Sequence, residues 1–150
     1  MGTYRKILLA VDLTADTTQI AERAKAFAAN QDAELELLHV IEPVPLVTPL
    51  DVPEGMTPAV LATQDEIAAG ARTRLAKLAA ELGVPASRAH VIVGNTQAEI
   101  VRAARERQVD VIVLGGRERH GLSLLVDFTE DAVLHKAPCD VLVVRVKPRA

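Results

Sequence analysis

Five short apolar runs constrain the fold of this chain more than any other feature of the sequence. They are rich in Val, Leu and Ile and lie at Ile7–Val11, Glu34–Val40, Ala89–Val93, Val109–Leu114 and Asp140–Val146. Continuous apolar runs of this length are typical of strands that are buried on both faces, as in parallel sheets. Segments with helical periodicity separate the runs. This alternation predicts an α/β fold with one open, mostly parallel five-stranded sheet and helices on both faces.

Capping residues and breakers place the helices. The first helix is expected to follow the caps at Thr14–Asp16, and a long second helix is expected from Thr57-Pro58 to a stop at Gly83. A capping box at Thr96–Glu99 starts the third, and the fourth is expected over Leu122–Lys136. Between the second strand and the second helix, the proline-rich stretch from 42 to 58 is expected to be a loop.

Length and charge bound the class of protein. The 150 residues suit one domain spanning residues 1–150. The net charge of −3 argues against a general nucleic-acid binder, which usually has a basic surface. No apolar stretch approaches the roughly 18 residues of a membrane span, and the apolar run that ends before Asp12 is too short for a secretory signal. A lone Cys139 fits a reducing compartment, so a cytoplasmic protein without membrane insertion is expected.

The residue types that carry catalysis do not form a recognisable constellation. His39, His90, His120 and His135 are scattered, and none has a partner at metal-ligand spacing. The sequence has no G-x-S-x-G nucleophile elbow and neither of the common phosphate-binding fingerprints. We therefore expect no catalytic residues, no metal site and no enzymatic activity.

A ligand site, if present, is expected at the carboxyl ends of the strands, where open α/β sheets bind ligands. The residues there are Asp12, Val40–Ile41, Gly94–Asn95 and the segment Gly115–Gly121. In that segment, glycines would allow close backbone approach to a phosphate, and Arg117 would add a charge-assisted bond. Two alternatives stay open. For the glycines, the choice is between a turn beside solvated arginines and contact with a ligand. For Asp12, it is between binding a ligand and capping the next helix.

These pieces together resemble the universal stress protein family. The similarity is carried, in order, by Tyr4–Asp12, Leu38–Val40, Val93–Thr96, His120–Leu125 and Ala137–Val144. The resemblance implies a Rossmann-like sheet with strand order 3-2-1-4-5 and a switch point between the first and fourth strands. It also implies a homodimer formed through the fifth strand, Val141–Val146, and an unprotected apolar edge strand favours such pairing.

Many members of that family bind ATP through Gly-x-x-Gly, a spacer, and Gly-Ser or Gly-Thr. Here Gly115 matches the first glycine, but Glu118 replaces the second. Asp127-Phe128 replaces Gly-Ser and precedes Thr129. A carboxylate about 4 Å from a phosphate repels it by roughly 4 kcal/mol per unit pair at an effective dielectric of about 20. The resemblance therefore comes with a degraded triphosphate site.

The sequence thus favours a non-enzymatic stress-response dimer that acts through an unidentified protein partner and needs no cofactor. The alternative is a regulator that binds ATP or AMP, with Mg²⁺ beside the ATP, and hydrolyses it slowly at most. The candidate nucleotide-binding residues of this alternative are Asp12, Val40, Gly94, Gly115, Gly116, Arg117 and Thr129.

Overall fold

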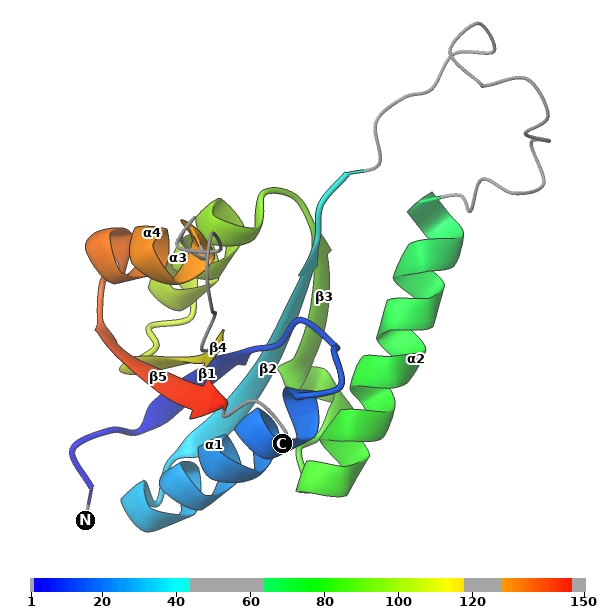
Figure 1. The fold of residues 1–150 in the computed structure, drawn as a ribbon. Helices are drawn as coiled ribbons and strands as arrows, with labels where there is room; N and C mark the ends of the chain where they lie inside the picture. The colour runs from blue at the N-terminus through cyan, green and yellow to red at the C-terminus, as the bar shows by residue number, and fades with distance from the viewer. Residues whose placement is uncertain (1, 44–63, 118–127, 147–150) are drawn as a thin grey trace, which may run out of the picture.

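A computed structural model describes residues 2–43, 64–117 and 128–146. Its centre is a five-stranded sheet in the order β3-β2-β1-β4-β5, with every neighbouring pair parallel (Figure 1). The expected strand order is therefore confirmed. The strands are β1 (Lys6–Ala10), β2 (Glu34–Ile41), β3 (Ala89–Val93), β4 (Val111–Arg117) and β5 (Asp140–Val146).

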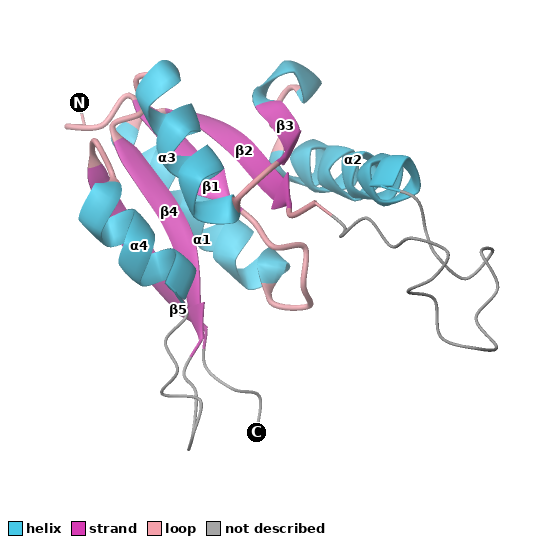
Figure 2. Ribbon diagram, turned by 90° about the horizontal axis from the view of Figure 1, so that it is seen from above, coloured by secondary structure: helices cyan, strands magenta, loops and turns pink. Residues whose placement is uncertain are grey.

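Helices cover both faces of the sheet, as the apolar strands require (Figure 2). Two of them, α1 (Thr17–Gln31) and α2 (Gln64–Leu82), pack on one face. The other two, α3 (Thr96–Glu106) and α4 (Phe128–Lys136), pack on the opposite face. A short 3-10 turn at Ala86–Arg88 leads from α2 into β3. The expected helix starts at Thr57 and Leu122 lie outside the described residues.

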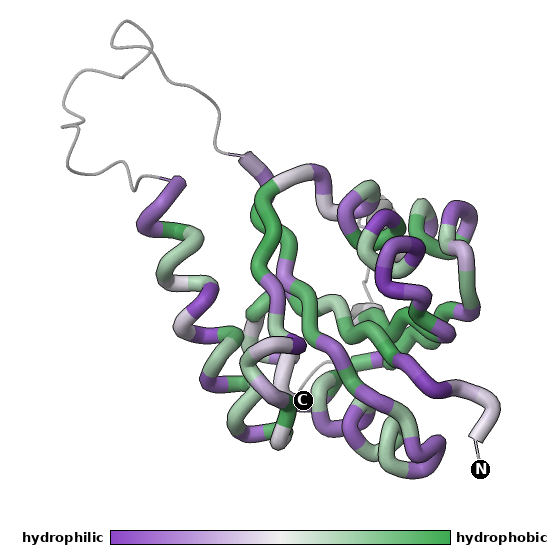
Figure 3. The backbone as a smooth tube through the Cα atoms, turned by 180° about the vertical axis from the view of Figure 1, so that it is seen from behind, coloured by the Kyte–Doolittle hydropathy of each residue, from purple (hydrophilic) through white to green (hydrophobic). Residues whose placement is uncertain are grey.

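The core forms one layer on each side of the sheet. Successive side chains along a strand point to opposite faces, so each strand contributes to both layers. In β1, Ile7 and Leu9 pack toward α1 and α2, whereas Leu8 packs toward α3 and α4. All three side chains are 0% exposed. Figure 3 shows the resulting apolar stretches along the central strands. Burial on both faces explains why the strands read as continuous apolar runs rather than as alternating ones.

Strand β4 differs from its expected bounds at both ends. It begins at Val111 because Val109 still belongs to the C-terminal end of α3. The Val109 amide donates to the Ala104 carbonyl oxygen at 3.0 Å. At the other end, β4 continues through Gly115 and Gly116 to Arg117, paired with the end of β5. The two glycines were expected after the strand. They lie inside it, because pairing with β5 extends the strand past them.

The cap of α3 also differs from the expected capping box. The N-cap residue is Asn95, whose side-chain oxygen accepts a hydrogen bond from the Ala98 amide at 3.0 Å. Thr96 is already helical, and its hydroxyl donates to Glu42 Oε1 at 3.1 Å. Asn is as good an N-cap as Ser or Asp, so the helix begins one residue earlier than the Thr–Glu pattern indicated.

Candidate functional site

The candidate site residues converge because all strands are parallel and end at one edge of the sheet. Ala10 pairs with Leu38 across β1 and β2, and Ile41 pairs with Val93 across β2 and β3. Along this edge, the strand order β3-β2-β1-β4 places the candidate residues side by side, in the spatial order Gly94, Val40, Asp12 and Gly115. The β1–β4 neighbourhood is the point where the connections diverge to the two faces, which is where such sheets bind ligands.

Asp12 makes its hydrogen bonds at the turn into α1 and is not the N-cap of that helix. Its Oδ1 accepts hydrogen bonds from the Thr14 amide at 3.2 Å, the Thr14 hydroxyl at 2.9 Å and the Thr17 hydroxyl at 3.3 Å. The formal N-cap of α1, Asp16, makes no side-chain cap bond. Asp12 therefore organises the turn into α1, while its side chain remains exposed at the sheet edge.

A side chain from α3 covers Gly94. A Cβ atom built at position 94 would lie 2.8 Å from Glu99 Cγ, so the glutamate occupies the space that a side chain would need. The Glu99 side chain is 17% exposed, and its Oε2 is 2.9 Å from Arg102 Nη2. The Gly94 amide donates to the Ile41 carbonyl oxygen at 2.9 Å, which fixes the β3 end against β2. Glu99, paired with Arg102, thus fills this part of the edge.

Gly115 lies against α1. A Cβ atom at this position would overlap the Ile20 Cδ1 atom, and Ile20 is 7% exposed. The φ angle of Gly115 lies outside the left-handed region, so the backbone conformation does not demand glycine. A side chain at this position would require Ile20 on α1 to shift. Gly116, the next residue, is buried.

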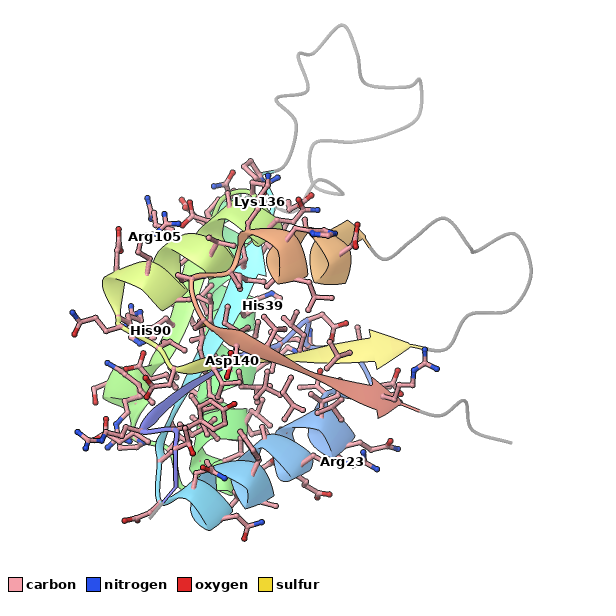
Figure 4. The ribbon with its side chains drawn as sticks, turned by 90° about the vertical axis from the view of Figure 1, so that its left-hand side faces the viewer. Arg23, His39, His90, Arg105, Lys136 and Asp140 are labelled. Carbon is pink, nitrogen blue, oxygen red and sulfur yellow. The ribbon has the colours of Figure 1, made fainter. Side chains whose placement is uncertain are left out.

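Val40 and His39 lie at the end of β2 on opposite faces. Val40 is half-buried against the α3 and α4 layer of the core. His39 Nδ1 lies 2.7 Å from the Val11 carbonyl oxygen, and since a carbonyl only accepts, Nδ1 donates. This bond ties β2 to the turn that carries Asp12. His39 is labelled in Figure 4. A structural role for His39 fits this contact.

The phosphate half of the expected site is only partly described. Arg117 is the last residue of β4, and its backbone pairs with Val146. Thr129 is the second residue of α4. Glu118 and Asp127, the substituted motif positions, lie outside the described residues, and Phe128 is the first residue of α4.

The sequence analysis missed a cluster of charged groups around Glu36 in β2. Glu36 is 5% exposed and lies on the α3 face of the sheet. Its carboxylate is 3.2 Å from Lys6 Nζ, 3.2 Å from Arg107 Nη1 and 3.5 Å from His90 Nε2. Glu36 is the third of the eight residues of β2, nearer its amino end than its carboxyl end, so this cluster is separate from the candidate site. The signal was an acid flanked by leucines in the run Glu34–Ile41.

Within that cluster, His90 has a lowered pKa. Burial is the main cause that lowers the pKa of His90, and the Arg107 guanidinium is the next. Arg107 Nη1 lies 2.9 Å from His90 Nε2, which therefore accepts the hydrogen bond and leaves the ring proton on Nδ1.

The half-buried thiol of Cys139 has a raised pKa, first because of burial and then because of the neighbouring Asp140 carboxylate. That shift disfavours the reactive thiolate.

The described ranges hold neither a cluster of metal ligands nor a helix suited to a bilayer. In residues 2–43, 64–117 and 128–146, no three His, Cys, Asp or Glu side chains gather as ligands for a metal ion. None of the helices in those ranges combines the length and the apolar character needed to cross a bilayer.

The parallel sheet and its edge site define an open, Rossmann-like α/β protein, and comparison with known proteins specifies the family. Residues 3–145 match the sequence profile of the Universal stress protein family. Universal stress protein A homolog 2 of Coxiella burnetii is 35% identical over 148 residues, covering 98% of this chain and 99% of that protein. This chain belongs to the universal stress protein family.

Solved structures show the same fold. Universal stress protein UspA from Lactobacillus plantarum superposes with a TM-score of 0.71 at 22% identity, covering 97% of this chain and 100% of that one. A universal stress protein solved in complex with cAMP gives a TM-score of 0.62 at 20% identity, covering 94% and 96%. The sequence-based assignment of family and fold class is thus confirmed.

Proposed function

We propose that this protein is a non-enzymatic, cytoplasmic regulatory dimer of the stress response that acts by binding a protein partner, and that its ATP binding is lost or weak. The observation that carries the proposal is the Glu99 side chain, which fills the space over Gly94 at an edge that also holds the Asp12 carboxylate. In the sequence, Glu118 and Asp127 stand at two more positions of the phosphate motif. Carboxylates at a phosphate site repel the ligand unless a cation intervenes.

The packing of Gly115 supports the same proposal. Its lack of a side chain is explained by contact with Ile20, so no ligand is needed to account for the glycine. Likewise, the bonds of Asp12 to Thr14 and Thr17 account for that carboxylate within the fold. Asp12 and Gly115 therefore each have a structural reason that does not involve a nucleotide.

A second candidate function is a regulator that binds ATP or AMP. One observation favours it: Asp12, Val40, Gly94 and Gly115 lie along a single edge at the switch point of the sheet. A relative of the same fold was solved with cAMP. With Mg²⁺, carboxylates and phosphates would share a cation, since both are ligands that Mg²⁺ prefers.

Calorimetry with ATP on nucleotide-stripped protein, with and without Mg²⁺, separates the two functions. We expect no detectable heat of binding at millimolar ATP in either condition. The matched control restores the motif with Glu118→Gly, Asp127→Gly and Phe128→Ser together, and this variant is expected to gain ATP affinity. Micromolar binding by the unaltered protein would instead establish the nucleotide-dependent regulator.

The dimer is proposed to form through the edges of β5 in two copies. In β5, the apolar side chains of Val141, Leu142 and Val143 are only partly buried within one copy. We expect Val143→Lys to convert the dimer to a monomer in sedimentation equilibrium, because inserting charges at an edge strand prevents pairing. Val93→Lys is the control. Val93 is 37% exposed on β3, the opposite edge, so its variant is expected to remain dimeric. A dimeric Val143→Lys variant would exclude β5 pairing.

A further inference from the structure

We propose that a groove between α3 and α4 binds an acidic, amphipathic segment of the protein partner. The inference rests on the proposed function and gives the partner a docking surface and a chemistry. The groove encloses about 560 Å³ and lies beside α3, with Lys136 at the end of α4 contributing from the other side. We call it the α3–α4 groove; the side chains that carry the argument are Ala98, Val101, Arg102, Arg105 and Lys136.

The floor of the α3–α4 groove is apolar. Ala98 and Val101 are three residues apart on α3 and therefore lie on the same face of the helix. Val101 is 8% exposed and Ala98 is exposed, so apolar atoms line the groove between its charged flanks. Such a floor accepts an aliphatic side chain of a bound segment, as grooves that hold amphipathic helices do.

The charges of the groove are all positive. Arg102, Arg105 and Lys136 line it, and none of its lining residues is acidic. Arg102 is neutralised by Glu99 at 2.9 Å and by Glu106 at 3.8 Å. For Arg105 and Lys136, no carboxylate of the described residues lies within ion-pair distance.

Arg105 and Lys136, which have no carboxylate partner among the described residues, give the groove a local positive charge on a protein whose net charge is −3. Figure 4 shows Arg105 and Lys136 on the same layer of the molecule, with Arg23 on the opposite layer. A segment that places carboxylates at Arg105 and Lys136 and an apolar side chain over Val101 would satisfy both features of the groove. Two cations beside an apolar floor suit a peptide better than a nucleic acid, whose binding depends on many phosphate contacts.

A labelled synthetic peptide of interspersed Glu and Leu residues tests this inference by fluorescence anisotropy. Amide chemical shifts then locate the bound peptide. We expect saturable binding that shifts α3 and α4 resonances and weakens with added salt. The variant Arg105→Glu with Lys136→Glu should lose about tenfold in affinity or more, because two attractions become repulsions. The control Arg23→Glu with Lys25→Glu makes the same charge change on exposed positions of α1 and should bind as the unaltered protein does.

Four results would overturn the inference. The first two are no binding at millimolar peptide, and equal affinity for a control peptide with Gln in place of Glu. The third is a groove variant that binds the peptide as tightly as the unaltered protein does. The fourth is a single-stranded oligonucleotide that binds as tightly as the peptide. The calorimetric test with ATP reports separately on the proposed function. Absence of ATP binding together with absence of peptide binding would remove only the groove, whereas micromolar ATP binding would remove the proposed function whatever the peptide does.

Discussion

Replacing Glu36 with glutamine is expected to lower the free energy of unfolding by about 2–3 kcal/mol. The substitution keeps the volume of the side chain but removes the carboxylate that lies 3.2 Å from both Lys6 and Arg107. Those cations would then be close together without a counter-charge. Loss of one partner of a buried pair typically costs about 3–5 kcal/mol. We expect less, because the side chains of Lys6 and Arg107 are each 31% exposed and water screens them in part.

Urea unfolding followed by circular dichroism measures this effect, and Glu34→Gln is the matched control. Glu34 lies two residues earlier in the same strand and is exposed, so its variant is expected to stay within about 0.5 kcal/mol of the unaltered protein. If Glu36→Gln also stays within that range, the attraction within the cluster does no more than offset the cost of burying the charges. The cluster would then specify the arrangement of the strands without stabilising it.

Glu36 also marks the limit of what the sequence could predict. Periodicity located the five strands, because burial on both faces leaves a direct trace in local composition. The partners of Glu36 lie 30, 54 and 71 residues away, at Lys6, His90 and Arg107 (36 minus 6, 90 minus 36 and 107 minus 36). No local pattern identifies such contacts. They exist only once the strand order places β1 and β3 on either side of β2.

The candidate site shows the same division. Strand ends could be read from the sequence, and parallel topology then brought Asp12, Val40, Gly94 and Gly115 to one edge. The function of each residue could not be read in this way. The role of Gly94 depends on Glu99 folding back from the first turn of α3, and the extent of β4 depends on pairing with β5. A glycine pair reads as a turn locally, but a neighbouring strand decides whether the chain turns there.

Gly115→Ala is expected to destabilise the protein by about 1–3 kcal/mol, the usual cost of overpacking a core. The added methyl group overlaps Ile20 Cδ1, and although this atom is the mobile end of its side chain, Ile20 is 7% exposed and has little room to move. Gly70→Ala is the matched control on α2. No atom lies within 4 Å of a Cβ at Gly70, and alanine favours helix, so this variant should be up to about 1 kcal/mol more stable.

A double-mutant cycle with Ile20→Val identifies the cause, since valine lacks the δ-methyl group that the new Cβ meets. Ile20→Val alone should cost about 0.5–1.5 kcal/mol, and the combined variant should be about 1 kcal/mol more stable than the sum of the two changes predicts. Thermal and urea unfolding of the four proteins provide the measurement. Coupling of that size means that the packing of α1 on β4 selects the glycine. A tolerated Gly115→Ala without coupling would mean that packing does not require it, and would strengthen the case for a ligand that approaches the backbone at the end of β4.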